Sequence, residues 1–162
     1  KEASGTGNMK FMMNGALTLG TLDGANVEMH QVLGDENMFL FGLTADEAAR
    51  LRQSYDPYLL YTRDPVLHRV LDQLKTGFRD GVSYEDLYQR LLYGADCPAD
   101  QYLLLADFAS YCAASHRVVD TYAGREKWNR MSLHNIARSG IFSADRSIAD
   151  YADTIWHVPY KK

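Results

Sequence analysis

The sequence predicts an α/β protein that is rich in helices, and two observations lead to this prediction. The first 42 residues alternate between helical and strand-like patterns. Nearly all later segments repeat their apolar residues with the period of a helix and carry helix-capping residues at their starts. We therefore expect a small parallel sheet near the N-terminus and mainly helices after it.

The first 42 residues read as helix, strand, helix and strand. Gly15 is a suitable stop for a helix over residues 7–14, and Gly34 for a second helix over residues 25–33. The apolar segments 16–22 and 38–41 are short, which is typical of buried strands. A helix between two strands favours a parallel pair, because the crossover brings the second strand back in the same direction. Two or three strands are too few for a complete doubly wound sheet, so we expect the missing strands upstream.

The rest of the chain is expected to be helical. Thr44 and Glu47 have the spacing of a capping box, which predicts a helix over residues 45–53. Asp64 and Pro65 begin another helix, which ends at Gly77. The other expected elements are a helix capped by Ser83 and Asp86 that runs through Tyr93, a brief strand over 102–105, and helices over 107–122, over 125–139 (ended by Gly140), and from 143 onward.

Composition excludes several classes of function. The 162 residues have the length of one domain, with a formal net charge of −4 and a pI of about 5.7, so no basic surface for nucleic acid is expected. The apolar runs are too short to cross a membrane, and the scattered histidines lack the spacing of a metal site. Two cysteines are too few for a disulfide scaffold, and Cys112, on an apolar helical face, is expected to be buried. A protein of the reducing cytoplasm fits this composition.

The first ten residues combine small residues with a lysine. The run from Ala3 to Gly7 lets backbone N–H groups approach a ligand closely, and a helix that starts near Gly7 would direct its unpaired N–H groups to the same point. This arrangement suits a phosphate. Lys10 lies about one turn further on, in an apolar sequence that would favour its neutral, imine-forming amine. A phosphate site and an imine-forming lysine together suit pyridoxal phosphate. An ordinary glycine turn and a snorkelling surface lysine remain equally open on these grounds.

Two other acidic positions are less specific. Glu2 could accept hydrogen bonds from sugar hydroxyls, although a solvated terminal carboxylate is the simpler interpretation. Asp23 precedes the predicted second helix and Glu28 lies in its first turn, where negative charge favours the helix dipole. Capping is therefore expected for this pair rather than catalysis.

Several motifs resemble those of a known family. They are residues 2–10 (EASGTGNMK), 14–18 (NGALT) and 20–28 (GTLDGANVE), with looser agreement at 37–42, 107–108, 128–130 and 143–152. Together they resemble the C-terminal part of the α-glucan (glycogen, starch, maltodextrin) phosphorylases, of the bacterial type. The resemblance covers essentially the whole chain, while whole phosphorylases are several times longer.

The resemblance implies a GT-B architecture, in which two Rossmann-like domains enclose the active site. Residues 1–162 would be one partial domain, the distal, helix-rich portion of the C-terminal domain, with the cofactor attached within residues 2–10. Lys10 would form the Schiff base with pyridoxal 5'-phosphate, with Thr6 and Gly7 binding its phosphate through backbone N–H groups. Glu2, Ser4 and Gly5 would contact glucosyl hydroxyls.

The resemblance also implies an activity. The parent enzyme would be a homodimeric transferase that uses orthophosphate to release glucose 1-phosphate from α-1,4-glucan. The cations that gather the two phosphates would lie upstream, so this chain alone is expected to be inert. Three alternatives stay open: another pyridoxal phosphate enzyme, such as a transaminase or decarboxylase, a nucleotide-sugar glycosyltransferase, and a non-catalytic helical or oligomerisation module.

Overall fold

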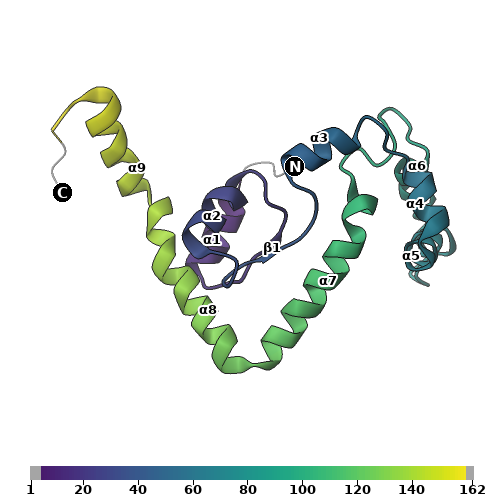
Figure 1. Ribbon diagram of the computed structural model, residues 1–162, viewed down its shortest axis with the longest axis horizontal. Coiled ribbons are helices and arrows are strands. Elements are labelled where there is room, and N and C mark those ends of the chain that lie inside the picture. The colour runs from purple at the N-terminus through teal and green to yellow at the C-terminus, as the bar shows by residue number, and fades with distance from the viewer. Residues whose placement is uncertain (1–4, 160–162) are drawn as a thin grey trace. The chain divides into compact units, whose positions relative to one another are not determined.

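A computed structural model describes residues 5–159 of the chain. These residues form two compact units, which we call the sheet unit (residues 5–40 and 114–159) and the helical unit (residues 41–113). The long helix α7 (Leu104–Ala123) begins in the helical unit and continues into the sheet unit. The expectation of a helix-rich α/β protein is confirmed (Figure 1).

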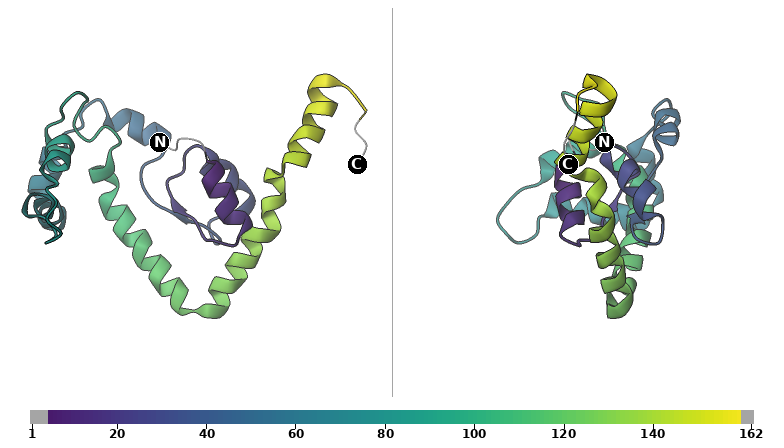
Figure 2. Two further views of the ribbon diagram at one scale, coloured as in Figure 1. Left: turned by 180° about the vertical axis from the view of Figure 1, so that it is seen from behind. Right: turned by 90° about the vertical axis from the view of Figure 1, so that its left-hand side faces the viewer.

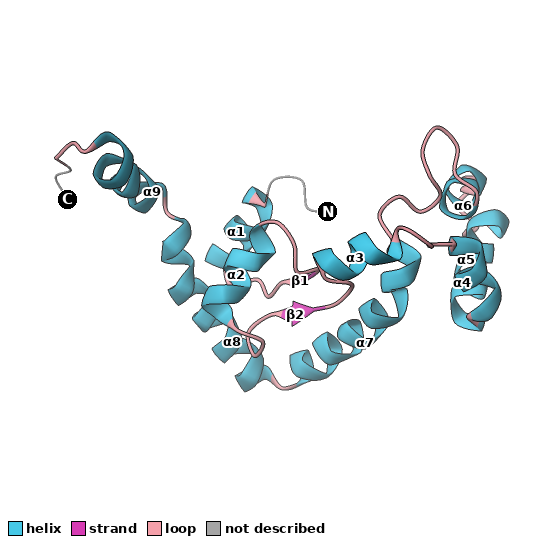
Figure 3. Ribbon diagram, turned by 45° about the horizontal axis from the view of Figure 1, so that its top comes forward, coloured by secondary structure: helices cyan, strands magenta, loops and turns pink. Residues whose placement is uncertain are grey.

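The sheet unit begins with the predicted alternation of helices and strands. Its first elements are α1 (Thr6–Met13), β1 (Leu19–Gly20), α2 (Ala25–Leu33) and β2 (Phe39–Leu40). The two strands run parallel, with Leu19 opposite Phe39, and Figure 3 shows them side by side. The predicted parallel pair and both predicted helices are confirmed, although each strand is only two residues long.

The apolar core of this unit joins α1 to α2. Met12 and Met29 are completely buried, and they pack with Leu33 and Met38. Helix α8 (Arg125–Arg138) lies against both α1 and α2, as the two views of Figure 2 also show. The helix that carries Lys10 is therefore held in place by two neighbouring helices.

The outer edges of the two strands differ. Phe39 donates its N–H to the Thr18 carbonyl at 2.9 Å, so the backbone of Phe39 faces β1. The backbone groups of successive residues in a strand face opposite sides, so the Leu40 carbonyl faces away from β1. That carbonyl accepts a hydrogen bond from the Arg117 guanidinium at 2.9 Å. A side chain thus occupies the outer edge of β2, which protects it from further strand pairing. The Leu19 backbone, on the outer edge of β1, has no hydrogen-bond partner within residues 5–159.

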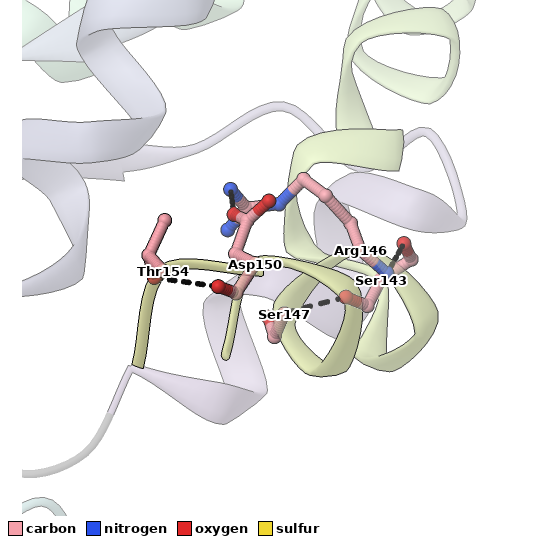
Figure 4. Close-up of polar contacts among 5 residues, drawn as sticks. All are labelled: Ser143, Arg146, Ser147, Asp150 and Thr154. Atoms are coloured by element: carbon pink, nitrogen blue, oxygen red, sulfur yellow. Dashed lines mark hydrogen bonds and ion pairs between the residues drawn. The ribbon is translucent and has the colours of Figure 1, made fainter. Parts of the chain in front are cut away.

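The chain of the sheet unit ends in a series of helical turns. Helix α8 (Arg125–Arg138) ends within one residue of the predicted end, and Gly140 itself lies in the 3₁₀ helix η1 (Ser139–Phe142) that follows. Ser143 caps α9 (Ala144–Tyr151) as expected, by accepting the Arg146 N–H. Figure 4 shows this cap and the ion pair of Arg146 with Asp150. A π-helical turn, η2 (Ala152–Trp156), follows and was not predicted.

The helical unit packs short helices around a second core. It contains α3 (Ala45–Leu51), α4 (Pro57–Arg63), α5 (Pro65–Thr76) and α6 (Glu85–Leu92). Thr44 and Glu47 form the predicted capping box, and Asp64 caps α5 as predicted. The core of the unit consists of Tyr61, Leu67, Leu71, Tyr88, Leu92 and Leu105.

Three expectations for the helical unit are wrong. Residues 102–105 form no strand, because α7 already begins at Leu104, where the buried Asp100 carboxylate accepts the N–H groups of Leu104 and Leu105. Ser83 is not the N-cap residue of α6, which is Tyr84, although the Ser83 hydroxyl accepts the N–H of Glu85 at 3.4 Å. Cys112 is half-buried rather than buried. Within the described part of the chain, no helix is long and apolar enough to cross a membrane.

Candidate functional site

The candidate site is the N-terminal turn of α1. The helix begins at Thr6, after Gly5, which is buried and has a φ of +69°. A residue with a Cβ rarely adopts this left-handed conformation, so glycine is required for the chain to enter the helix in this way. No side chain caps the helix, and the Gly7 N–H has no partner among residues 5–159. The turn thus presents the Gly7 N–H at the positive end of the helix dipole.

Lys10 lies on the same face of α1 as this turn. It follows Thr6 by four residues and Gly7 by three, so helical geometry places its Cα about 4.5–6 Å along the axis from theirs, on one side of the helix. Side chains in a helix tilt toward its N-terminus, which directs the lysine stem toward the anion-binding turn. A phosphate at the turn and an aldehyde at the amine can therefore belong to one small molecule.

The surroundings of Lys10 differ from the expectation. Its side chain is exposed, and the neighbouring Phe11 and Met13 are 64% and 51% exposed. Only Met12 of this apolar run is buried. The apolar surroundings expected for Lys10 are therefore absent among residues 5–159, because its apolar neighbours in sequence point in different directions around the helix.

A pair of asparagines connects this turn to the start of α2. Asn8 donates its side-chain N–H to the Asn26 side-chain oxygen at 2.9 Å, and Asn26 donates to the Thr21 carbonyl at 2.9 Å. Asn26 is only 4% exposed. Sequence reasoning did not single out either residue, although both lie in the family-like motifs 2–10 and 20–28. Their pairing joins residues 18 positions apart, which no local pattern reveals.

Asp23 has a different role from the one predicted. Gly24 is the N-cap residue of α2, and no side chain caps this helix. The Asp23 carboxylate instead accepts the Thr21 hydroxyl at 2.9 Å, within the turn that leads to α2. Glu28 does lie in the first turn of α2, where its charge suits the dipole.

The structure brings together four of the predicted site residues. Gly5, Thr6, Gly7 and Lys10 share the first turns of α1. Glu2 and Ser4 lie outside the described residues, so their predicted contacts with substrate are not tested. The group of four fits pyridoxal phosphate: the uncapped turn suits its phosphate, no described atom outside the neighbouring residues and the helix backbone lies within 4 Å of where a Gly7 Cβ would stand, and the lysine supplies an amine one turn away.

Other features of the described chain do not compete with this site. No group of three His, Cys, Asp or Glu side chains that could hold a metal ion occurs in residues 5–159. A cavity of about 1290 Å³ lies in the sheet unit, beside β2 and the start of α8, and includes none of the predicted site residues. Its lining carries four basic and four acidic side chains, so its charge selects no ligand class. They are Arg117, Arg125, Lys127, Arg130, Asp35, Glu36, Asp120 and Glu126.

Comparisons with known proteins agree on one family. A family model described as carbohydrate phosphorylase matches residues 1–158. The glycogen phosphorylase of Chlamydia pneumoniae is 45% identical over 160 residues, which cover 99% of this chain and 19% of that protein. That of Synechocystis sp. is 46% identical (98% of this chain, 18% of that protein), and the muscle form from Bos taurus is 45% identical (97% and 18%).

The comparisons show which family the chain belongs to and what share of its relatives' length it spans. The identities to bacterial and mammalian relatives are nearly equal. The chain spans about a fifth of the length of the relatives that it matches. Because the family model covers nearly the whole sequence, the chain belongs to the carbohydrate phosphorylase family.

Proposed function

We propose that this chain is the cofactor-attachment part of an α-glucan phosphorylase, an enzyme that releases glucose 1-phosphate from α-1,4-glucan with orthophosphate. The observation that carries the proposal is the placement of Lys10 on the same face of α1 as an uncapped, glycine-rich first turn. Membership of the family, with relatives named glycogen phosphorylase, supports it.

Each residue of the turn has a distinct task in this proposal. Lys10 attaches pyridoxal phosphate covalently through its side-chain amine. The backbone N–H groups of Thr6 and Gly7 bind the phosphate at the helix N-terminus, where the dipole favours negative charge. Gly5, together with Glu2 and Ser4, contacts the hydroxyls of the glucosyl unit.

The bound cofactor supplies a phosphate with a second pKa of about 6, which suits proton exchange with the substrate phosphate near neutral pH. The protein must hold that phosphate in a fixed position and keep the amine within reach of the aldehyde. A short helix anchored by Met12 in the core meets both requirements, because the turn and the lysine belong to one rigid element.

The fold supports a larger assembly around this element. The outer edge of β1 is unpaired within the described residues, whereas that of β2 is covered by Arg117. In the proposal, further parallel strands from the upstream polypeptide extend the sheet from β1. Residues 1–162 then form the distal part of one Rossmann-like domain of a GT-B enzyme. A cytoplasmic homodimer is the proposed state of the parent protein.

Titration with pyridoxal phosphate tests the attachment. The 162-residue chain should develop the absorbance of a lysine imine, and Lys10→Ala should abolish it. Lys127→Ala is the matched control, since Lys127 is also exposed on a helix of the sheet unit that follows a glycine with no side-chain cap, but it is the third residue of α8, whereas Lys10 is the fifth residue of α1 and lies one turn beyond its glycine turn. Imine absorbance that persists in Lys10→Ala, or that Lys127→Ala removes instead, would refute the assignment.

Phosphorolysis is expected from the longer parent polypeptide but not from the 162-residue chain alone. We expect no glucose 1-phosphate from the isolated chain with glucan and orthophosphate, because a complete site needs cationic residues from outside it. The longer polypeptide should release glucose 1-phosphate and lose this activity on Lys10→Ala. Measurable phosphorolysis by the 162-residue chain alone would contradict the proposal that part of the active site lies outside this chain.

A further inference from the structure

We infer that Asn8 and Asn26 are positioning residues that fix the first turn of α1 for the cofactor phosphate, an inference that rests on the proposed function. Asn8 is the third residue of α1 and directly follows Gly7, whose N–H is proposed to bind the phosphate. The Asn8 side chain is joined to Asn26 at 2.9 Å. The pair thus connects the anion-binding turn to the first turn of α2.

Asparagine is the residue type that this connection requires at position 26. Its side-chain oxygen accepts from Asn8 while its nitrogen donates to the Thr21 carbonyl, so both ends of one amide are used. An aspartate could accept but not donate, and a leucine could do neither. With 4% exposure, Asn26 has little access to water that could replace these partners.

Gly20 contributes the space in which Asn26 lies. A Cβ at position 20 would stand 2.8 Å from the Asn26 side-chain nitrogen, which is closer than two such atoms can approach. The amide is therefore confined between the end of β1 and the first turn of α1. Because both of its hydrogen bonds are made and its volume is restricted, its oxygen holds Asn8 in one orientation.

The opposite end of α1 is held by a separate contact. The Ser132 hydroxyl, on α8, donates to the Gly15 carbonyl at 2.7 Å. This bond stabilises the same helix but lies at its C-terminal end, beyond Lys10 and away from the phosphate-binding turn. It therefore offers a matched control, in which a hydrogen bond that holds the chain just after α1 is lost without a change at the phosphate-binding turn.

The test compares two probes, pyridoxal phosphate and pyridoxal, which share the aldehyde and differ in the phosphate. Pyridoxal also forms an internal hemiacetal, but this factor is the same for every variant, so a change in the ratio of their imine-formation constants at Lys10 measures a change in the phosphate site. We expect Asn8→Ala to lower this ratio about tenfold, the size of one hydrogen bond to a charged group, and Asn26→Ala to lower it similarly. Ser132→Ala should leave the ratio within twofold of the unchanged chain.

The outcomes are distinct. A general loss of structure would also remove the phosphate site and lower the ratio, so the comparison is made only for variants whose circular dichroism matches that of the unsubstituted chain. An unchanged ratio in a folded Asn8→Ala overturns the inference. If Asn26→Ala fails to fold by circular dichroism, the half-buried Asn8 still provides the test through Asn8→Ala. If the unsubstituted chain forms no imine at Lys10 with either probe, the proposed function itself fails, and this inference fails with it.

Discussion

Gly15→Ala tests how firmly the lysine-bearing helix is fixed. Gly15 follows α1 with a φ of +76°, and a Cβ there would stand 2.4 Å from the Ser132 hydroxyl and 3.1 Å from the Ile136 side chain. The left-handed backbone costs about 1–2 kcal/mol for a residue with a Cβ. Displacement of Ser132 also removes its bond to the Gly15 carbonyl, which adds about 1 kcal/mol. We expect a loss of about 2–3 kcal/mol.

Urea unfolding followed by circular dichroism measures this loss. Gly81→Ala is the control for the backbone cost, because Gly81 has a φ of +77° and no atom within 4 Å of a Cβ position. It should cost about 1–2 kcal/mol. Ser132→Ala should cost less in the Gly15→Ala background than in the unsubstituted chain, because the hydroxyl has already been displaced there. The reasoning fails if Gly15→Ala destabilises the chain no more than Gly81→Ala.

Two further predictions concern the helical unit. Leu71 is 3% exposed in the core of this unit, so Leu71→Ala should lower the free energy of unfolding in urea by about 2–5 kcal/mol. Val70 is 38% exposed, so Val70→Ala should lower it by less than about 1 kcal/mol. Equal losses would contradict the assigned core. Hydrogen bonds from the Thr44 backbone and hydroxyl lower the pKa of Glu47 below its ordinary value of 4.5. The capping box therefore stabilises α3 above pH 4.5 and loses this effect as the pH falls through the lowered pKa. Glu47→Gln should make the free energy of unfolding less dependent on pH in this acid range. An unchanged pH profile would contradict this role.

Local signals in the sequence predicted much of the fold. Asp64, Pro65 and Gly77 mark both ends of α5, because capping and helix termination involve residues within one turn of each other. The same Asp-Pro signal begins α4 at Asp56 and Pro57 but was not used, although the structure shows the aspartate as a cap. The parallel pairing of β1 and β2 followed from the length of the intervening helix.

The wrong predictions concern features that depend on contacts between distant parts of the chain or on unusual backbone conformations. Asp100 and Leu103 have positive φ values of 39° and 60°, which non-glycine residues seldom adopt, and they lead the chain into α7 where a strand was expected. Lys10 was expected in apolar surroundings because its sequence neighbours are apolar, but around a helix these neighbours point in different directions.

In the candidate site, too, local features could be predicted from the sequence, whereas contacts between distant residues could not. Its glycine turn and lysine are adjacent in sequence, so their chemistry could be predicted from spacing. The hydrogen bond between Asn8 and Asn26 depends on how α1 and α2 pack, which the core residues Met12 and Met29 determine. Asn8 and Asn26 both lie in family-like motifs of the sequence, but no sequence pattern indicates that their side chains are in contact.

Identification of the modified lysine tests the central claim most directly. The chain is mixed with pyridoxal phosphate, reduced with borohydride to make the bond permanent, digested and examined by mass spectrometry. The account predicts the added mass on the peptide that contains Lys10, at substoichiometric concentrations of the reagent, before any other lysine is modified. Modification spread evenly over the exposed lysines, with no preference for Lys10, would show that the first turn of α1 does not recognise the phosphate.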